Sequence, residues 1–476
     1  MYKPAAWRDD PECGHHVACP YQTHYCTYIR VPRLLTLQSS NSVPPSPGEL
    51  ILLTGYQWYE LWFSVLLADL RAILSDNGAT FESIKLLRRG IALFKLFEQH
   101  ADLLESLVVR ELMLTKRLRS SRNKIFSDQL SGIVALARHL PNSNDPALTD
   151  ATREYSAHLT SFRTRFAKLV KQTLVPKSTR AASYAEWLRL SELLDLQDGP
   201  KADWAEVGSP PTALMKPEQI SVDENMFIVV HQCFEIWFKV ILDHIDQAIK
   251  RLFDGDIANA TRLLRHVVQI QRLLNQQIEI PATMLPLDFM RFRSQRMERD
   301  GKVLVTGLSP ASGTESYQFR EIEIVCGLRD DSTFTHYLQG NEKLPIQLLT
   351  PRQSERIAQP SLGDAFRHAV RQRGIENYDA LFTLANVPNP NADLADLADT
   401  FIEFDEAFRF WRLRHVSMVE KMIGAKSGTG FLGPEYLMET AGIKIQEKNR
   451  IFEERQVRPR FFEELWQVRS RMTSGV

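Results

Sequence analysis

The chain has 476 residues, and its 58 Lys and Arg side chains balance 58 Asp and Glu side chains, so the formal net charge is zero. This balance argues against binding to nucleic acid or to an anionic membrane through bulk charge. An apolar content of 44% excludes global disorder. The N-terminus has no secretory-signal pattern, and no apolar run reaches the roughly 18 residues of a membrane span. Five cysteines form no disulfide framework in a chain of this length, so we expect a reduced, cytoplasmic setting.

Residues 1–21 form a Cys/His-rich tail that includes Cys13, His15, His16 and Cys19, and His24 and Cys26 follow it closely. Mixed Cys and His ligands in a short span can bind zinc. The irregular spacing matches no familiar zinc finger, so a flexible tail without metal is the alternative.

The rest of the sequence has a helical texture, because long amphipathic stretches alternate with proline-rich joints. We therefore predict an all-α protein, with strand confined to short hairpin-like pieces such as Lys302–Thr306.

Three segments of the chain recur in the same order, at offsets of 159, 175 and 177 residues. The matched pairs are Tyr25–Gln38 with Tyr184–Gln197, Tyr56–Phe63 with His231–Phe238, and Lys85–Arg88 with Arg262–Arg265. Ordered matches with a slowly drifting offset indicate an internal duplication. The first copy runs from about residue 22 to 175 and the second from near 181 to the end, which predicts domains at 22–180 and 181–476.

The second copy carries two histidines on apolar helix faces. Ser221 and Glu224 form a plausible capping box before a helix on which His231 shares the buried face with Phe227 and Phe234. His415 lies within an apolar stripe of the segment 404–423. A histidine in such a setting is usually a core residue with a local hydrogen bond, and the alternative is an axial haem ligand. Spacing alone does not distinguish the two.

Several segments of the second copy resemble the tryptophan 2,3-dioxygenase family, whose members are helical and haem-dependent. The matching segments, in order, are YAEWLRLSELLDLQ at 184–197, DENMFIVVHQCFEIWFK at 223–239, LDFMRFR at 287–293, LSPASGTESYQFR at 308–320, WRLRHVSMVEKMIGAKSGTG at 411–430 and FFEELWQVR at 461–469. The resemblance covers residues 181–476. It implies a haem-dioxygenase-like helical bundle preceded by a degenerate helical half-repeat.

The resemblance also implies roles for single residues. His415 would be the proximal ligand of the iron of one haem b group. His231 would be the distal, catalytic histidine, accepting a hydrogen bond from the indole N–H of the substrate, and Phe227 would line the indole pocket.

The polar end of the substrate would be held by the segments that follow. Arg293 would bind the substrate carboxylate as a bidentate fork, Phe289 would pack on the ring, and Thr429 would hold the amino-acid end. Tyr184 and Trp187 match aromatic residues that reach a neighbouring subunit's site in the family. Together with His231 and Phe227, these five residues form the predicted substrate-binding set.

Three departures from the family pattern surround the substrate's polar end. The loop Gly428–Gly433 is one residue shorter and contains two bulky apolar side chains, the connection Ser294–Gly307 is longer, and SPASGFQS reads SPASGTES. In the first copy, Tyr56 stands where His231 stands, and residues 100–180 contain no counterpart of Arg293, of the SPASG segment or of His415. We therefore expect one haem per chain, and residues 22–175 packed on residues 181–280 as a pseudo-dimer.

The leading hypothesis is a haem-dependent oxidoreductase that opens the pyrrole ring of L-tryptophan with O₂ to give N-formylkynurenine, as in tryptophan catabolism along the kynurenine pathway. One alternative is a haem monooxygenase that hydroxylates an aromatic amino acid or indole derivative, and another is a non-catalytic haem-binding protein. The predicted partners are the small-molecule substrate and O₂, with no nucleic acid and no membrane. We expect a homo-oligomer, such as a dimer of pseudo-dimers.

Overall fold

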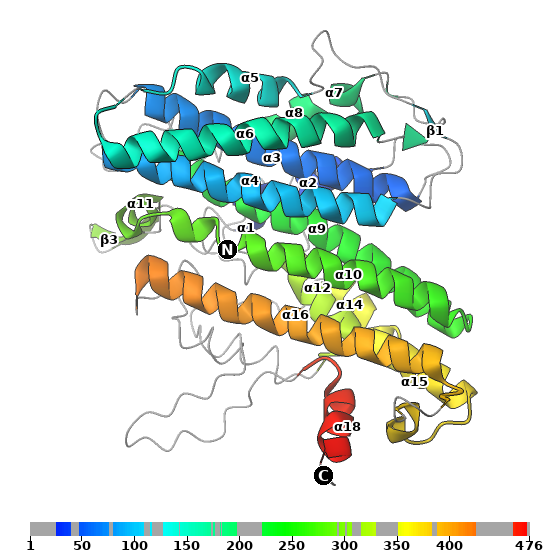
Figure 1. Ribbon diagram of the computed structural model, residues 1–476. Coiled ribbons are helices and arrows are strands. Elements are labelled where there is room, and N and C mark those ends of the chain that lie inside the picture. The colour runs from blue at the N-terminus through cyan, green and yellow to red at the C-terminus, as the bar shows by residue number, and fades with distance from the viewer. Residues whose placement is uncertain are drawn as a thin grey trace. The chain divides into compact units, whose positions relative to one another are not determined.

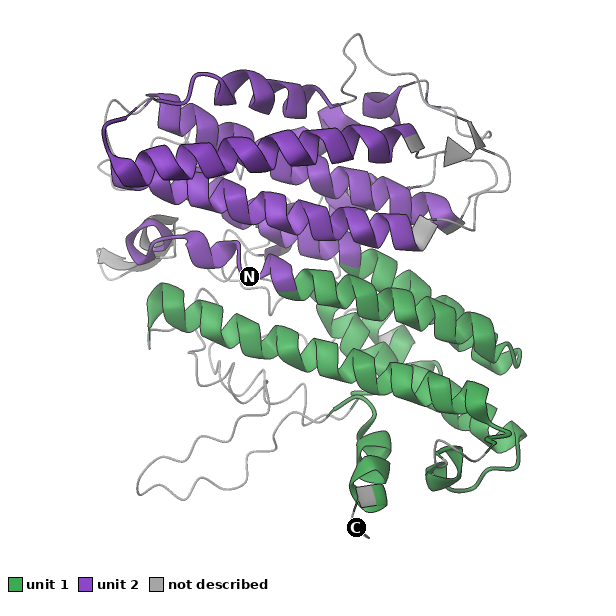
Figure 2. Cartoon of the chain, viewed as in Figure 1, with its two compact units in different colours: residues 1–20, 238–275, 314–476 green, residues 21–237, 276–313 purple. Residues whose placement is uncertain are grey.

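The structure is a computed structural model (Figure 1). It describes residues 25–39, 47–75, 80–108, 115–116, 127–141, 143–172, 175–176, 181, 183–197, 221–292, 295–299, 302–306, 316–329, 351–382, 388–424 and 460–473. The chain divides into two compact units, shown in Figure 2. Unit 1 comprises residues 1–20, 238–275 and 314–476, and unit 2 comprises residues 21–237 and 276–313.

Unit 2 is built mainly of helices, and α4 packs against both α3 and α6, while α3 also packs against α5. Its elements are α1 (Tyr25–Ile29), α2 (Val31–Thr36), α3 (Pro47–Ser75), α4 (Thr80–Val108), β1 (Thr115–Lys116), α5 (Asp128–Ala137), α6 (Pro146–Gln172), β2 (Val175–Pro176), α7 (Tyr184–Trp187), α8 (Leu190–Leu194), η2 (Asp195–Gln197), the first part of α9 (Val222–Phe253), η4 (Pro281–Thr283), α11 (Pro286–Phe292), β3 (Gln295–Arg299) and β4 (Lys302–Thr306).

Unit 1 contains the second part of α9 and further helices, among which α12 packs against α14 and α15, and α16 packs against α18. Its other elements are α10 (Ile257–Gln277) as far as Asn275, α12 (Tyr317–Cys326), α14 (Pro351–Ala358), α15 (Leu362–Gln372), η6 (Tyr378–Leu381), α16 (Ala392–Ile423) and α18 (Glu463–Thr473).

The predicted all-α class is confirmed. Among the described residues, strand occurs only in two short antiparallel pairs, β1 with β2 and β3 with β4. The second pair contains the predicted strand Lys302–Thr306, which pairs with Gln295–Arg299. The predicted boundary at 180/181 stays a prediction, since unit 2 spans both sides of it.

The core of unit 2 holds large aromatic side chains from α3, α4 and α6, including the fully buried Trp58, Trp62 and Phe162. Close approach of α4 and α6 depends on Gly90, because a Cβ atom there would lie 2.3 Å from Cε2 of Tyr155. Interiors packed at this density tolerate no such overlap, so a larger residue would separate the two helices.

Helix α9 contains a long apolar stretch. By length and composition it could cross a membrane, but 83% of its most apolar 18-residue stretch is buried inside the protein. Ser221 caps it, since the Glu224 backbone N–H donates to Ser221 Oγ at 3.1 Å. The Glu224 carboxylate accepts a hydrogen bond from Tyr28 Oη at 2.6 Å, which ties the start of α9 to α1.

Candidate functional site

His231 lies in the third turn of α9, and its Nδ1 is 2.7 Å from the backbone oxygen of Phe227. A carbonyl oxygen only accepts hydrogen bonds, so Nδ1 carries the proton and donates it. In a neutral imidazole the other nitrogen is then an acceptor. The local helix geometry therefore fixes the tautomer in which Nε2 of His231 can accept an N–H group.

Burial keeps this imidazole neutral. The side chain is half-buried, while Phe227, Val230 and Phe234 around it are buried. Loss of hydration lowers the pKa of His231 to about 4, and the hydrogen bond to Phe227 opposes this change only in part. At neutral pH the ring is therefore uncharged and Nε2 keeps its lone pair.

Aromatic rings from three separate segments surround His231. The ring of Phe227 lies 4.4 Å from the imidazole between centroids, and Phe289 on α11 lies 6.1 Å from Phe227. Tyr25 on α1 packs edge-on against the imidazole at 5.7 Å. Of the residues that the sequence predicts to bind substrate, Phe227 thus lies beside His231 and Phe289 lies beside Phe227. Tyr25 was not predicted, although its match with Tyr184 in the repeat was a signal.

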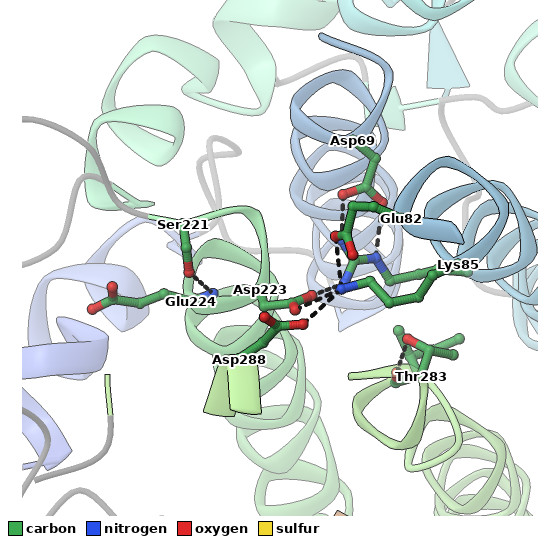
Figure 3. A network of polar contacts seen from close by, with 10 residues as sticks. Asp69, Glu82, Lys85, Ser221, Asp223, Glu224, Thr283 and Asp288 are labelled. Carbon is green, nitrogen blue, oxygen red and sulfur yellow. Dashed lines mark hydrogen bonds and ion pairs between the residues drawn. The ribbon is translucent and has the colours of Figure 1, made fainter. Parts of the chain in front are cut away.

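A buried ionic network holds the start of α9 and α11 in place (Figure 3). Nζ of Lys85, on α4, lies 2.9 Å from Oδ2 of Asp223 and 3.0 Å from Oδ2 of Asp288. Arg89, which is fully buried, binds Asp223 and also Asp69, with 2.8 Å between its Nε and Oδ2 of Asp69. Asp288 directly precedes Phe289, so Lys85 sets the position of α11 relative to α9.

The charges of this network compensate one another. Burial alone would raise the pKa of Asp223, but Arg89 and Lys85 outweigh it and hold that pKa below its usual value. Removing Arg89 would leave the buried Asp69 carboxylate without its partner, which is strongly destabilising. The network is therefore a structural support for the part of α9 that carries His231.

His415 lies on α16, in unit 1. Its imidazole is half-buried and stacks on the indole of Trp411, with centroids 5.2 Å apart and an angle of 29° between the planes. Trp411 in turn contacts Phe319 of α12 at 5.1 Å. The predicted apolar stripe contains three buried residues (Phe404, Phe408 and Met422) and three half-buried ones (Trp411, His415 and Met418). An imidazole in an apolar, aromatic setting can supply the axial nitrogen of a haem iron.

Buried ion pairs fix the helix that carries His415. Glu323 of α12 is fully buried and accepts hydrogen bonds from Arg412 at 2.7 Å and from Arg320 at 2.8 Å. Asp405 lies on α16 ten residues before His415. It accepts hydrogen bonds from the backbone N–H groups of Phe461 at 2.8 Å and Phe462 at 3.0 Å. Both sets of contacts restrict rotation of α16 and so the direction of His415.

The other predicted site residues fall into two groups. Arg293 and Thr429 lie outside the described residues, as does the loop Gly428–Gly433. Tyr184 and Trp187 are buried in unit 2, and their rings lie 5.8 Å and 6.0 Å from that of Tyr56. Their roles in substrate binding stay predictions.

The zinc hypothesis concerns the Cys and His residues near the N-terminus. Cys13 to His24 lie outside the described residues. Within the described ranges, no group of three or more His, Cys, Asp or Glu side chains could hold a metal ion. The cysteines Cys233 and Cys326 are buried and not in disulfides.

Comparisons with known proteins give a consistent result. A family model described as Tryptophan 2,3-dioxygenase matches residues 170–377. A tryptophan 2,3-dioxygenase of Herpetosiphon aurantiacus is 32% identical over 311 residues, a match that covers 61% of this chain and 99% of that protein. One from a Nocardioides species is 34% identical over 262 residues, covering 52% and 84%, and one from Caulobacter vibrioides is 29% identical over 310 residues, covering 61% and 98%.

Proposed function

The chain belongs to the tryptophan 2,3-dioxygenase family, and we propose that it is an oxidoreductase that opens the pyrrole ring of L-tryptophan with O₂ to form N-formylkynurenine. Both oxygen atoms are added across the C2–C3 bond of the indole, and that bond breaks. The observation that carries this proposal is the state of His231, a neutral imidazole with an acceptor nitrogen among aromatic rings. Such a nitrogen suits a substrate that presents a neutral N–H group on an aromatic system.

The residues present fit a haem group. His415 offers a half-buried imidazole on the apolar stripe of α16, beside Trp411. A nitrogen ligand in an apolar surround is what haem b requires of a protein with a single proximal histidine. When bound, the haem supplies the reactions of O₂. His415 would hold the iron, and the ion pairs of Arg412 and Arg320 with Glu323 would keep the His415 helix from turning.

His231 would orient the indole by accepting its N–H hydrogen bond at Nε2. The proton on Nδ1 stays on the imidazole, because it is donated to the Phe227 carbonyl oxygen, which lies 2.7 Å from Nδ1. Phe227 and Phe289 would pack on the indole and exclude water from it, and both are buried. Holding a substrate in one orientation next to the reacting group accounts for a large part of enzymatic rate enhancement.

The polar end of the substrate would be held by Arg293 and Thr429, as the family pattern implies. Arg293 directly follows α11, whose position Lys85 fixes through Asp288. A planar guanidinium binds a carboxylate through two parallel hydrogen bonds, which sets the angle of the amino acid as well as its affinity. We place the activity in tryptophan catabolism along the kynurenine pathway, in the cytoplasm.

The test is a product assay with haem-loaded protein, L-tryptophan, O₂ and a reductant. The expected product is N-formylkynurenine containing two atoms from ¹⁸O₂. A hydroxylated amino acid containing one labelled atom would instead identify a monooxygenase. Stoichiometric haem with no turnover, under conditions in which a family member from Herpetosiphon aurantiacus is active, would identify a haem-binding protein without catalysis.

A further inference from the structure

The short helices at the start of the two sequence repeats have the same unusual backbone. Arg30 precedes α2 with φ 57°, and Arg189 precedes α8 with φ 53°, and these are the only non-glycine residues with positive φ in the described part of the chain. They are 159 residues apart, which is the offset of the matched segments Tyr25–Gln38 and Tyr184–Gln197. A left-handed arginine is strained. Its presence at both equivalent positions argues for one ancestral backbone.

The two copies of this segment exchange contacts reciprocally within unit 2. Tyr25 Oη donates to Glu235 Oε1 at 2.8 Å, and its counterpart Tyr184 donates to Glu60 Oε1 at 3.0 Å, where Glu60 and Glu235 are also counterparts at offset 175. Each tyrosine therefore belongs to one copy and the carboxylate that it contacts belongs to the other.

Two further contacts follow the same rule. Tyr28 Oη donates to Glu224 at 2.6 Å, and Trp187 Nε1 donates to Glu49 at 3.2 Å. The side-chain Nε2 of Gln232 donates to the backbone oxygens of Ile29 and Leu196. In the same way, Nε2 of Gln57 donates to the backbone oxygens of Leu188 and Leu37. Arg33 and Glu192, which are counterparts of each other, form a direct ion pair at 2.5 Å. Reciprocal contacts of this kind define a two-fold interface between like subunits. Here the interface lies inside one chain.

The helix that carries His415 also has a counterpart in the first copy, although none was expected from the sequence. FRTRFAKLV at 162–170 of α6 aligns with WRLRHVSMV at 411–419 of α16, at offset 249. The ion pair of Lys95 on α4 with Glu154 on α6 corresponds to that of Arg272 on α10 with Glu403 on α16. This alignment puts Phe166 at the position of His415.

The two positions that correspond to the histidines are closed against each other in the first copy. The ring of Tyr56, the counterpart of His231, contacts that of Phe166 edge-on with centroids 6.2 Å apart. Both side chains are 1% exposed. Tyr184 and Trp187 pack on the other sides of Tyr56. We call Tyr56, Phe166, Tyr184 and Trp187 the silent site. Directly contacting rings leave no space for a macrocycle between them.

We propose that the N-terminal half acts as a built-in partner subunit: its Tyr25 completes the site at His231, whereas Tyr184 of the catalytic half is used in the silent site. This inference rests on the proposed function and assigns Tyr25 as a positioning residue. The rings of Tyr25 and His231 form a T-shaped contact, with 75° between their planes, and the Tyr25 hydroxyl binds Glu235, one turn after His231 on α9. Tyr25 thus limits the movement of the imidazole and covers one side of it.

The experiment compares Tyr25→Leu with Tyr184→Leu in the full-length, haem-loaded protein. Both substitutions remove a buried tyrosine whose hydroxyl binds a glutamate, so both should lower the urea midpoint of unfolding to a similar extent. Tyr25→Leu should raise the Kd for L-tryptophan, measured by calorimetry, about tenfold, and Tyr25→Phe should restore most of the affinity. Tyr184→Leu should leave that Kd within about twofold, because the proposal gives to Tyr25 the substrate-binding role that the sequence predicts for Tyr184.

A second measurement does not depend on the substrate. With ¹³Cε1-labelled histidine, the NMR signal of His231, assigned by its loss in His231→Gln, should shift in Tyr25→Leu because the ring current of Tyr25 is lost. It should stay in place in Tyr184→Leu. The signal is measured in the ferrous carbon monoxide form, or in haem-free protein if no haem is retained.

The outcomes separate the two proposals. Wild-type protein that binds no L-tryptophan would defeat the proposed function, while the NMR comparison would still decide the role of Tyr25. Loss of affinity in Tyr184→Leu with normal affinity in Tyr25→Leu would overturn the inference, as would equal effects of the two substitutions on affinity and on the His231 signal.

Discussion

Glu60 should make the stability of the protein depend on pH in a direction opposite to that of most carboxylates. It lies on α3, is fully buried, and accepts hydrogen bonds from Tyr184 at 3.0 Å and from Gln129 at 2.8 Å. Burial raises the pKa of Glu60 from 4.5 to about 7, and the hydrogen bonds from Gln129, Ser127 and Tyr184 offset only part of that rise. Folding therefore favours the protonated acid.

The direction of this pH dependence follows from the linkage between proton binding and folding. Because the folded pKa lies above the unfolded one, the contribution of Glu60 to stability is complete below about pH 4.5 and is lost as the pH rises through 7. A rise of this size corresponds to roughly 3 kcal/mol. Glu60→Gln has the same shape and no charge to bury. We expect it to be more stable than the wild type by about 1–3 kcal/mol at pH 8.5, and within about 1 kcal/mol of it at pH 5.

The assay is urea unfolding of wild type and Glu60→Gln at both pH values, followed by far-UV circular dichroism. Glu154→Gln is the matched control, because Glu154 is exposed on α6 and its substitution should change stability by less than about 0.5 kcal/mol at either pH. A Glu60→Gln protein that is equally destabilised at pH 5 and pH 8.5 would show that Glu60 is ionised in the folded protein and that its charge is stabilising.

Three further predictions concern haem and substrate. His415→Ala should lose stoichiometric haem whereas His231→Ala should keep it, as measured by the Soret absorbance per chain. A full Soret band in His415→Ala would exclude His415 as the haem ligand. Arg293→Lys should weaken L-tryptophan binding by roughly 1–3 kcal/mol, because lysine lacks the planar fork; equal affinities of the wild type for L-tryptophan and tryptamine would contradict a carboxylate clamp. A haem titration should saturate at one per chain, and saturation at two would contradict the silent site.

The first residue of a helix can be predicted from the sequence where a proline stands there. Helices α3, α6, α11 and α14 each begin at a proline, respectively Pro47, Pro146, Pro286 and Pro351. Proline suits the first helical position, because the N–H group that it lacks would have no partner within the helix there. Pro47 and Pro146 stand at the ends of the proline-rich segments 42–47 and 141–146.

Periodicity predicted the face on which each histidine lies, but not the partners of that face. It placed His231 and Phe227 one turn apart, and the structure adds the hydrogen bond that selects the tautomer of His231. The contact of Tyr25 with Glu235 joins residues 210 positions apart. No local pattern contains such a pairing. It follows from the reciprocal interface, which only the comparison of the two copies in three dimensions reveals.

The ionic network around Lys85 escaped prediction for a different reason. In the sequence, Lys85 and Arg89 are one turn apart on an amphipathic helix, a spacing typical of an exposed charged face. In the structure Arg89 is fully buried and Lys85 is 8% exposed. Charges are buried at a cost that only paired partners compensate, and the partners here, Asp223 and Asp288, lie 138 and 203 residues from Lys85.

Under the proposal that the two halves are copies, the differences between them follow from what each residue must do once one site is closed. The interface residues are identical in both copies at Gln57 and Gln232 and at Glu60 and Glu235. Each is a buried polar group, and losing its partner would leave an unsatisfied donor or acceptor at a cost of roughly 1–3 kcal/mol. The residues at the site itself carry no such constraint. An imidazole without a ligand or a substrate is a buried polar ring with nothing to bind, and an aromatic side chain fills the same volume. Phe166 accordingly stands where His415 stands, and it is held in place by contacts with Tyr56 and Tyr59 at 6.2 Å and 5.3 Å. Chemistry can therefore be lost from one half while the interface that supports the other half is kept.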